Sequence, residues 1–94
     1  MPVRWLRRSL RNLDEEATYI ARDDPKAAAR IVEHIVASVD QLAAPPAMGR
    51  PGRVPGTREL IVSGSPYLVP YRMRGGTVEV LAVFHGARKW PDKL

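Results

Sequence analysis

Glycine is confined to the second half of this 94-residue chain, and that division is the strongest constraint on its fold. All seven glycines follow residue 48, whereas the first half contains helix-favouring runs such as Ala27 to Ala29. Glycine weakens helices and is the usual residue of tight turns, so helices are expected before residue 48 and turn-linked strands after it. The sequence therefore predicts a single α+β domain over residues 1–94 in which the helices come first.

Apolar residues at helical spacing predict a first helix from about residue 7 to 22. The residues of this stripe recur every three or four positions and are Leu6, Leu10, Leu13, Ala17 and Ile20. The polar residues predicted for the opposite side are Arg8, Arg11, Asn12, Glu15, Glu16 and Arg22. Before this helix, the short apolar segment from Val3 to Trp5 fits an edge strand.

A second helix of about 19 residues is predicted to start at Pro25, where Asp24 can cap it, and to stop at Pro45-Pro46. Its apolar stripe is Ala28, Ile31, Ile35, Val39 and Leu42. The link between the two helices is so short that they must pack antiparallel. The first half thus predicts an N-terminal antiparallel α-helical hairpin.

Three strands are predicted in the second half, over residues 57–63, 67–74 and 77–85. Gly75-Gly76 supplies a two-residue hairpin turn between the last two. The segments form a small antiparallel β-sheet on which the helical hairpin should pack. Pro70 lacks the N–H that a central strand requires, so we expect a bulge or a locally unpaired side there.

A two-residue turn at Gly75-Gly76 sets Tyr71 opposite Val80, and this register assigns the two faces of the sheet. The face expected to lie against the helices holds Tyr67, Val69, Tyr71, Met73, Val78, Val80, Ala82 and Phe84. The other face holds Leu68, Arg72, Arg74, Glu79, Leu81, Val83 and His85. Because no further segment remains to cover it, this second face is predicted to be a binding surface.

The formal net charge is +5, and residues 49–94 carry the whole excess, with eight Arg or Lys against three Asp or Glu. A basic half favours polyanions or acidic protein surfaces as partners. There is no cysteine, which excludes disulfides and thiolate metal sites. No apolar run approaches the roughly 18 residues of a membrane span, so we expect a soluble, cytoplasmic protein.

The sequence contains no pattern that predicts a metal site, a phosphate-binding loop or a cofactor. His34 fits a surface position on the second helix. The remaining polar set comprises Arg50, Arg53, Arg58, Arg72, Arg74, Arg88, His85 and Trp90. Such a set suits phosphate contacts, stabilisation of transition-state charge or capture of an acidic peptide, and composition does not choose among these.

The chain resembles the RelE/ParE toxins of bacterial type II toxin–antitoxin modules over nearly its whole length. The segments that carry the resemblance, in the expected order, are YIARDDPKAA, GRPGRVPGTREL, PYLVPYR and VEVLAVFHGARKWP. It implies a cytoplasmic toxin that inhibits growth or stabilises plasmids, in a hetero-oligomer with a small antitoxin. The antitoxin segment would fold across the toxin surface, and the second sheet face is where it should bind.

This family divides into ParE-like inhibitors of DNA gyrase, which lack nuclease residues, and RelE-like enzymes that cut messenger RNA in the ribosome. The resemblance favours the ParE-like branch, because Leu68 stands where RelE-like nucleases place an arginine for the scissile phosphate. A ribonuclease remains the alternative, with Glu59, His85 and Arg88 as its catalytic residues. Glu59 also fits a solvent-facing strand residue, and Arg72 a simple cross-strand partner of Glu79. A third reading is a degenerate toxin that only binds its antitoxin.

Under the leading reading the protein is not an enzyme and has no catalytic residue, metal or cofactor. The residues expected to bind the antitoxin or the target are Arg50, Arg53, Arg58, Leu68, Arg72, Arg74, Leu81, Val83, His85, Arg88, Lys89 and Trp90. The expected partners are the antitoxin and DNA gyrase, or the ribosome with messenger RNA under the alternative.

Overall fold

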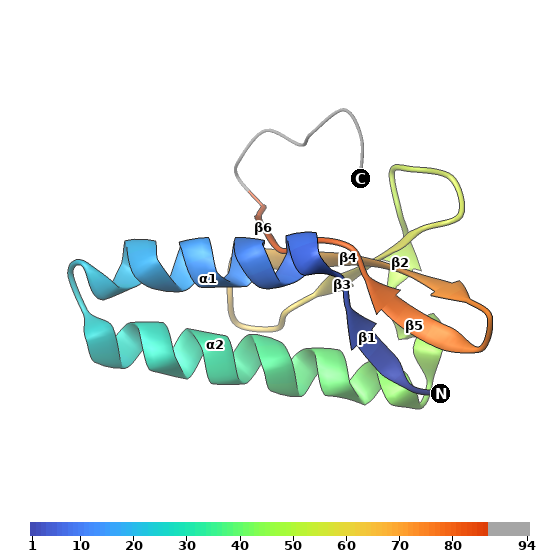
Figure 1. The fold of residues 1–94 in the computed structure, drawn as a ribbon, viewed down its shortest axis with the longest axis horizontal. Helices are drawn as coiled ribbons and strands as arrows, with labels where there is room; N and C mark the ends of the chain where they lie inside the picture. Colours follow the sequence, from blue (N-terminus) through green and yellow to red (C-terminus); the bar gives the residue numbers. More distant parts are fainter. Residues whose placement is uncertain (87–94) are drawn as a thin grey trace.

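A computed structural model describes residues 1–86 of the chain. The two helices are α1 (Arg7–Ala21) and α2 (Pro25–Asp40), followed by the short 3-10 helices η1 (Gln41–Ala43) and η2 (Pro46–Met48). The strands are β1 (Val3–Trp5), β2 (Arg50–Pro51), β3 (Arg58–Ile61), β4 (Tyr67–Arg74), β5 (Thr77–Val80) and β6 (Phe84–His85). Figure 1 shows α1 and α2 side by side as a hairpin, with the strands toward its right-hand end and partly overlapping the helices in this view.

The strands form one sheet in the order β1-β5-β4-β3-β2, with β6 paired to β4 beyond the end of β5. The meander of β3, β4 and β5 is antiparallel, as predicted. β1 is an edge strand, also as predicted, but it runs parallel to β5, so the sheet is mixed. The predicted α+β fold with an N-terminal helical hairpin is confirmed.

The start of α2 follows from its sequence, because the Asp24 side chain accepts a hydrogen bond from the Ala27 N–H at 3.0 Å and Pro25 occupies the first turn. The helix ends at Asp40, and η1 continues the turn to Ala43 just before Pro45. No helix within residues 1–86 is long and apolar enough to cross a membrane.

The core lies between α2 and the inner face of the sheet. Ile35, Val39 and Leu42 are fully buried, as the predicted stripe of the second helix requires. They pack with inner-face residues of the strands in one cluster, which includes Leu60, Val69, Tyr71, Val78 and Val80. Burial of each large side chain of this kind contributes about 1.5–3 kcal/mol, so this contact fixes the hairpin on the sheet.

The buried side of α1 agrees with the predicted stripe only in part, since Leu13 and Ile20 pack against the core cluster as predicted. Leu10 is 51% exposed, whereas Ser9 is fully buried and Glu16, predicted to be on the polar side, is only 5% exposed. The helix presents Asn12 to the sheet, where its Oδ1 accepts a hydrogen bond from the Val83 N–H at 3.1 Å. A buried backbone N–H without a partner is costly, so this contact favours the observed orientation of α1.

The predicted register between β4 and β5 is confirmed, with Tyr71 opposite Val80 and Arg74 opposite Thr77. Both turn glycines have the positive φ that such a tight turn needs, at 57° for Gly75 and 75° for Gly76. The predicted third strand is nevertheless interrupted, because β5 ends at Val80 and β6 begins only at Phe84.

Pro70 explains the interruption. The Leu81 N–H donates to the Pro70 carbonyl at 2.9 Å, but proline has no N–H with which to return the bond that an antiparallel ladder requires. Leu68 then pairs with Phe84, where an unbroken register would place Val83. The expected irregularity at Pro70 is therefore a bulge of one extra residue on the facing segment, 81–83.

The bulge moves the residues that follow it to the other face, since a slip of one residue reverses every side chain. Val83 is 2% exposed and belongs to the core cluster, and His85 lies opposite Tyr67, with ring centroids 5.7 Å apart. The prediction that Val83 and His85 lie on the second face is therefore wrong.

Candidate functional site

The sheet face opposite the helices, called the outer face below, carries charged and apolar residues in rows that cross the strands. Register aligns Arg4, Glu79 and Arg72 in one row, at the end nearest the Gly75-Gly76 turn. The next row runs from Leu81 through Pro70 and Glu59 to Arg50 on β2, and a third contains Leu68 and Ile61. Two carboxylates and several arginines thus share this face.

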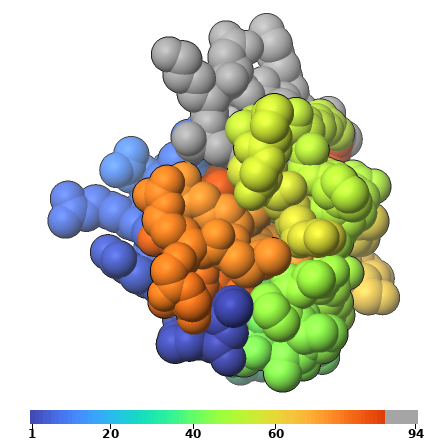
Figure 2. Space-filling view, turned by 90° about the vertical axis from the view of Figure 1, so that its right-hand side faces the viewer, coloured from blue at the N-terminus to red at the C-terminus, as the bar shows by residue number. Residues whose placement is uncertain are grey.

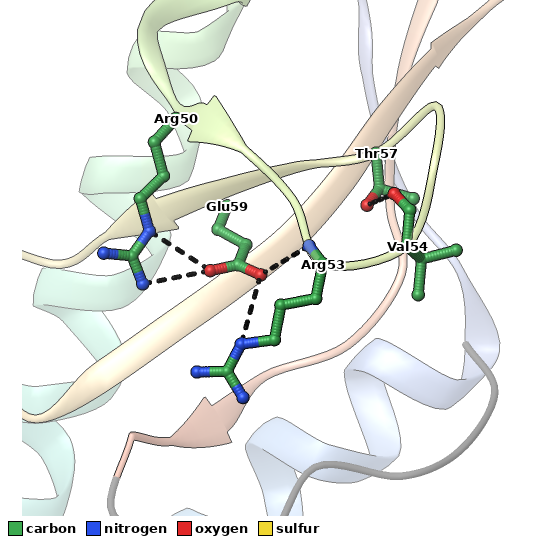
Figure 3. Close-up of polar contacts among 5 residues, drawn as sticks. All are labelled: Arg50, Arg53, Val54, Thr57 and Glu59. Carbon is green, nitrogen blue, oxygen red and sulfur yellow. Dashed lines mark hydrogen bonds and ion pairs between the residues drawn. The ribbon is translucent and has the colours of Figure 1, made fainter.

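The first carboxylate, Glu59, binds two arginines of the neighbouring loop (Figure 3). Its Oε1 accepts from Arg50 Nε at 3.2 Å and from Arg50 Nη2 at 3.0 Å. Its Oε2 accepts from the Arg53 backbone N–H at 3.1 Å and lies 3.9 Å from Arg53 Nε. Because the Glu59 side chain is only 2% exposed, it is neither solvent-facing nor open to a substrate. Glu59, Arg50 and Arg53 are called the Glu59 cluster.

The loop that follows this cluster is closed on itself by short hydrogen bonds. The Gly52 N–H donates to the Thr57 carbonyl at 2.8 Å, and both the N–H and the hydroxyl of Thr57 donate to the Val54 carbonyl, at 3.1 and 2.6 Å. Gly56 takes a φ of 81°, which most side chains disfavour. The loop over residues 52–57 is therefore a defined part of the surface.

Arg58 and Tyr71 anchor the segment before β2 from the inner face. The Tyr71 hydroxyl accepts from the Gly49 N–H at 2.7 Å and donates to the Pro46 carbonyl at 2.8 Å, and Arg58 Nη1 donates to the Gly49 carbonyl at 2.8 Å. Burial raises the pKa of Tyr71, and the Gly49 N–H and the Arg58 charge oppose this in part. Arg58, one of the residues predicted to contact a partner, donates to backbone carbonyls of this segment.

Gly49 is required at this anchor for steric reasons. A Cβ atom added there would lie 2.7 Å from the Tyr71 hydroxyl and 2.7 Å from the Glu59 carbonyl oxygen. The segment can therefore approach β3 and β4 this closely only because residue 49 has no side chain.

The second carboxylate, Glu79, is shared by arginines of the β4–β5 hairpin and β1. Arg72 Nε donates to Glu79 Oε1 at 2.7 Å, which confirms the cross-strand pair suggested by the sequence, and Arg74 Nε lies 3.9 Å from the same oxygen. The hydrogen bond from Arg72 lowers the pKa of Glu79 against the opposing effect of burial, and the charges of Arg72, Arg74 and Arg4 add to the lowering. These four residues are called the Glu79 cluster.

The apolar part of the outer face is less open than predicted. Leu68 and Leu81 are 8% and 5% exposed, so neither offers much surface to a partner. Ile61 is 53% exposed, and it pairs with Leu68 across β3 and β4. The sequence analysis did not select Ile61, although its position in the predicted first strand opposite Leu68 could have revealed it.

The structure does not bring together Glu59 and His85, the two candidate ribonuclease residues within residues 1–86. Glu59 lies opposite Pro70 and His85 lies opposite Tyr67, three residues away on the same strand, so the two side chains belong to opposite faces of the sheet. The Glu59 oxygens are also occupied by donors of Arg50 and Arg53. Arg88, Lys89 and Trp90 lie outside the described residues. Within residues 1–86 no three His, Asp or Glu side chains gather in a way that could hold a metal ion.

Two concavities away from the outer face were not predicted. One, of about 540 Å³, lies where α1 meets β6 and is lined by residues that include Asn12, Glu16, Tyr19, Val83 and Phe84. The other, of about 470 Å³, is lined by small and apolar residues of α1 and α2, among them Ala17, Ala21, Ala28, Ala29 and Val32. No sequence pattern predicts either concavity. The first depends on the orientation of α1, and the second depends on how closely α1 and α2 pack.

Comparison with known proteins gives one consistent relationship. Residues 3–90 match the family model described as the ParE toxin of type II toxin–antitoxin system, parDE. The chain is 51% identical over 92 residues to a Sinorhizobium fredii protein named "Putative toxin Y4kP", covering 98% of this chain and 95% of that protein. It is 33% identical over 81 residues to Toxin RelE1 of Caulobacter vibrioides, covering 84% and 86% of the two chains.

A solved structure shares the fold. It is described as the chromosomal ParDE TA system from P. aeruginosa, and it matches with a TM-score of 0.81 and 31% sequence identity. The match covers 90% of this chain and 95% of that one. The helical hairpin and the sheet that carries the outer face therefore correspond to the architecture of that toxin–antitoxin protein.

Proposed function

Because this chain belongs to the ParE toxin family of type II toxin–antitoxin systems, we propose that it inhibits DNA gyrase by protein–protein binding in the cytoplasm and is neutralised by a cognate antitoxin. The observation that carries the gyrase target is the outer face itself. On its strand β4, Leu68 is aliphatic and 8% exposed, and by the resemblance it stands where RelE-like nucleases place an arginine for the phosphate. Its buried carboxylate, Glu59, is committed to Arg50 and Arg53. Such a face suits protein binding better than cleavage of a phosphodiester.

The antitoxin and the target compete for the basic part of the molecule in this proposal. The chain has a formal net charge of +5, and Arg74, which pairs with Glu79 at 3.9 Å, has a side chain that is 66% exposed. Complementary charge speeds the encounter with an acidic partner and favours it over a basic one. An acidic antitoxin segment on the outer face would cover these arginines.

A supercoiling assay with purified gyrase tests the target. Toxin added in equal amounts to the enzyme should abolish supercoiling of relaxed plasmid, and pre-incubation with the antitoxin should restore it. Arg74→Glu should weaken inhibition, whereas Arg30→Glu, the same charge change at an exposed position of α2, is the matched control. Full supercoiling at a several-fold excess of toxin would disprove the gyrase target.

A ribosome-dependent messenger RNA endonuclease is the second candidate, because the relative at 33% identity carries the name RelE1. Primer-extension mapping of messages after toxin induction would reveal cuts in phase with codons. If the nuclease reading holds, His85→Ala and Arg88→Ala should abolish those cuts. A toxin that neither cuts messages nor inhibits gyrase, yet binds its antitoxin, would be the degenerate member of the family.

A further inference from the structure

A pocket of about 320 Å³ lies on the outer side of the β4–β5 hairpin. One wall is the loop tip Val54–Thr57, and the other consists of Arg72, Met73, Arg74 and Leu81. Figure 2 shows the loop (yellow-green) next to the hairpin (orange) on the same face of the molecule. The volume is at the lower end of the range of roughly 300–1,000 Å³ seen for small-ligand sites, so the pocket suits a group the size of one side chain.

The two arginines that line the pocket carry more positive charge than the neighbouring Glu79 carboxylate neutralises. Glu79 is the only acidic residue within residues 1–86 that forms an ion pair with Arg72 or Arg74. Arg72 uses its Nε for the close bond of 2.7 Å, whereas Arg74 approaches only to 3.9 Å and keeps 66% of its side chain exposed. One carboxylate thus faces two guanidinium groups. Arg74 therefore keeps N–H donors available for a second carboxylate.

The opposite wall is held in place by the Glu59 cluster. Glu59 accepts the Arg53 N–H at 3.1 Å, directly before Val54, and Thr57 closes the turn back to the Val54 carbonyl at 2.6 Å. These contacts fix the loop tip before any ligand arrives, and a preformed wall reduces the entropy lost on binding. Glu59 therefore acts on the pocket through the loop, without lining it.

We propose that this pocket receives an aspartate or glutamate side chain of the antitoxin. Arg72 and Arg74 bind the carboxylate, Val54 and Pro55 contact its aliphatic stem, and Glu59 is a positioning residue. The proposal rests on the proposed function, since it assumes an antitoxin. The apolar contacts favour a protein side chain over a nucleic-acid phosphate, and the Glu79 carboxylate beside the arginines disfavours a polyanion.

The first experiment uses the full-length chain and small probes alone, so it depends on neither gyrase nor antitoxin. The Arg Nε–Hε signals in a ¹H–¹⁵N NMR spectrum are followed during titration with the peptide acetyl-Leu-Glu-Leu-amide. The signals of Arg72 and Arg74 should shift, and the matching Gln peptide should bind about tenfold more weakly, because it offers no charged acceptor. Equal binding of the Gln peptide, or tighter binding of inorganic phosphate or a short oligonucleotide, would overturn the assignment.

Variants separate the binding residues from the positioning residue. Arg74→Gln should reduce the affinity for the Glu peptide about tenfold, while Arg30→Gln on α2 should leave it unchanged. Glu59→Gln should lower the affinity for the Glu peptide. The shift of the Arg74 Nε–Hε signal at saturation should stay the same, because the groups that bind the peptide remain. If Glu59→Gln fails to fold, Arg50→Gln removes the guanidinium bound to Glu59 from outside the pocket, loosens the same loop and should give the same result. Unchanged affinity in a folded loop variant would refute the positioning role.

The antitoxin is then tested directly by titration calorimetry against the full-length chain and its Arg72→Gln/Arg74→Gln variant. A loss of at least about tenfold in affinity supports the assignment of the occupant. If the variant binds the antitoxin as tightly as the parent chain does while the pocket binds the Glu peptide, the occupant is not the antitoxin. Gyrase inhibition is measured separately. If the chain does not inhibit gyrase, the peptide titration and the antitoxin titration still test the pocket.

Discussion

The two carboxylates on the outer face each face two arginines, but they are bound differently. Glu59 has a side chain that is 2% exposed and accepts hydrogen bonds from the Arg50 guanidinium and the Arg53 backbone N–H, so it joins the loop to β3. Glu79 has a side chain that is 11% exposed, lies near the Gly75-Gly76 turn and has one close bond, from Arg72, while Arg74 approaches only to 3.9 Å. The difference teaches that a carboxylate bound by several donors of a loop holds that loop in place, whereas one with a single close bond leaves a neighbouring arginine available to a partner.

This comparison also separates the arginines that the sequence grouped together. Arg50, Arg53 and Arg58 bind Glu59 or backbone carbonyls, so their loss should affect the fold first. Arg72 and Arg74 share the Glu79 carboxylate, which Arg74 approaches only to 3.9 Å, so the loss of Arg74 in particular should affect a partner first. Each prediction below tests one side of that division.

The largest effect is expected for Glu59→Ala. It removes the acceptor of Arg50 and of the Arg53 N–H in a buried setting, so the free energy of unfolding should fall by about 3 kcal/mol. Chemical denaturation followed by circular dichroism measures this loss. Glu79→Ala is the matched control and should lose clearly less. Equal losses in the two variants would remove the distinction between the clusters.

A smaller loss, of about 2 kcal/mol, is expected for Tyr71→Phe. The substitution leaves the Gly49 N–H and the Pro46 carbonyl without the hydroxyl that joins them. Tyr19→Phe, at a side chain that is 60% exposed, is the control and should change the unfolding free energy little. Burial raises the pKa of Tyr71, so its contribution should be complete below pH 10 and lost as the pH rises through the raised value.

The pH dependence of stability should identify Glu79. Its pKa is lowered from 4.5, chiefly by the Arg72 hydrogen bond, so its stabilising effect is present above about pH 4.5 and lost as the pH falls through the lowered value. The difference in melting temperature between the parent chain and Glu79→Gln should therefore shrink from pH 6 to pH 2. A difference that stays constant over that interval would show that the carboxylate does not act through its charge.

The smallest effect on stability is expected for Arg74→Ala. Its side chain is 66% exposed and its contact with Glu79 is 3.9 Å long, so the unfolding free energy should change by less than about 0.5 kcal/mol. Thermal unfolding monitored by calorimetry measures it. A large loss would place Arg74 with the structural arginines and contradict the role proposed for it in binding.

Much of the fold could be predicted because local rules decided it. The Asp24 cap, the apolar stripe of α2 and the Gly75-Gly76 turn each act within a few residues, and the structure has all three. The register of the β4–β5 hairpin followed from its turn, and the Arg72–Glu79 pair followed from the register.

The errors arose where distant parts of the chain decide the outcome. Pro70 predicted an irregularity but not that the extra residue would lie on the facing segment. The place of that bulge, and with it the change of face of Val83 and His85, depends on which backbone groups of the two strands meet. The rotation of α1 about its axis depends on the Val83 N–H, which is far away in the sequence. This N–H lies in the bulge and donates to the Asn12 side chain. Glu59 likewise seemed an ordinary strand residue, because nothing near it in the sequence shows that the loop returns to bind it.

The parallel pairing of β1 with β5 has a consequence for how the chain assembles. Val3 pairs with Val78 and Trp5 with Val80, and the Val78 N–H also donates to the Pro2 carbonyl at 2.8 Å. Contacts between such distant segments require the closure of a long loop, which slows their formation. The hairpin of α1 and α2 can form during synthesis. β1 is synthesised before it, however, and must wait for its partner β5, which is among the last strands to be synthesised. The start of the chain is therefore the final edge of the sheet to be fixed.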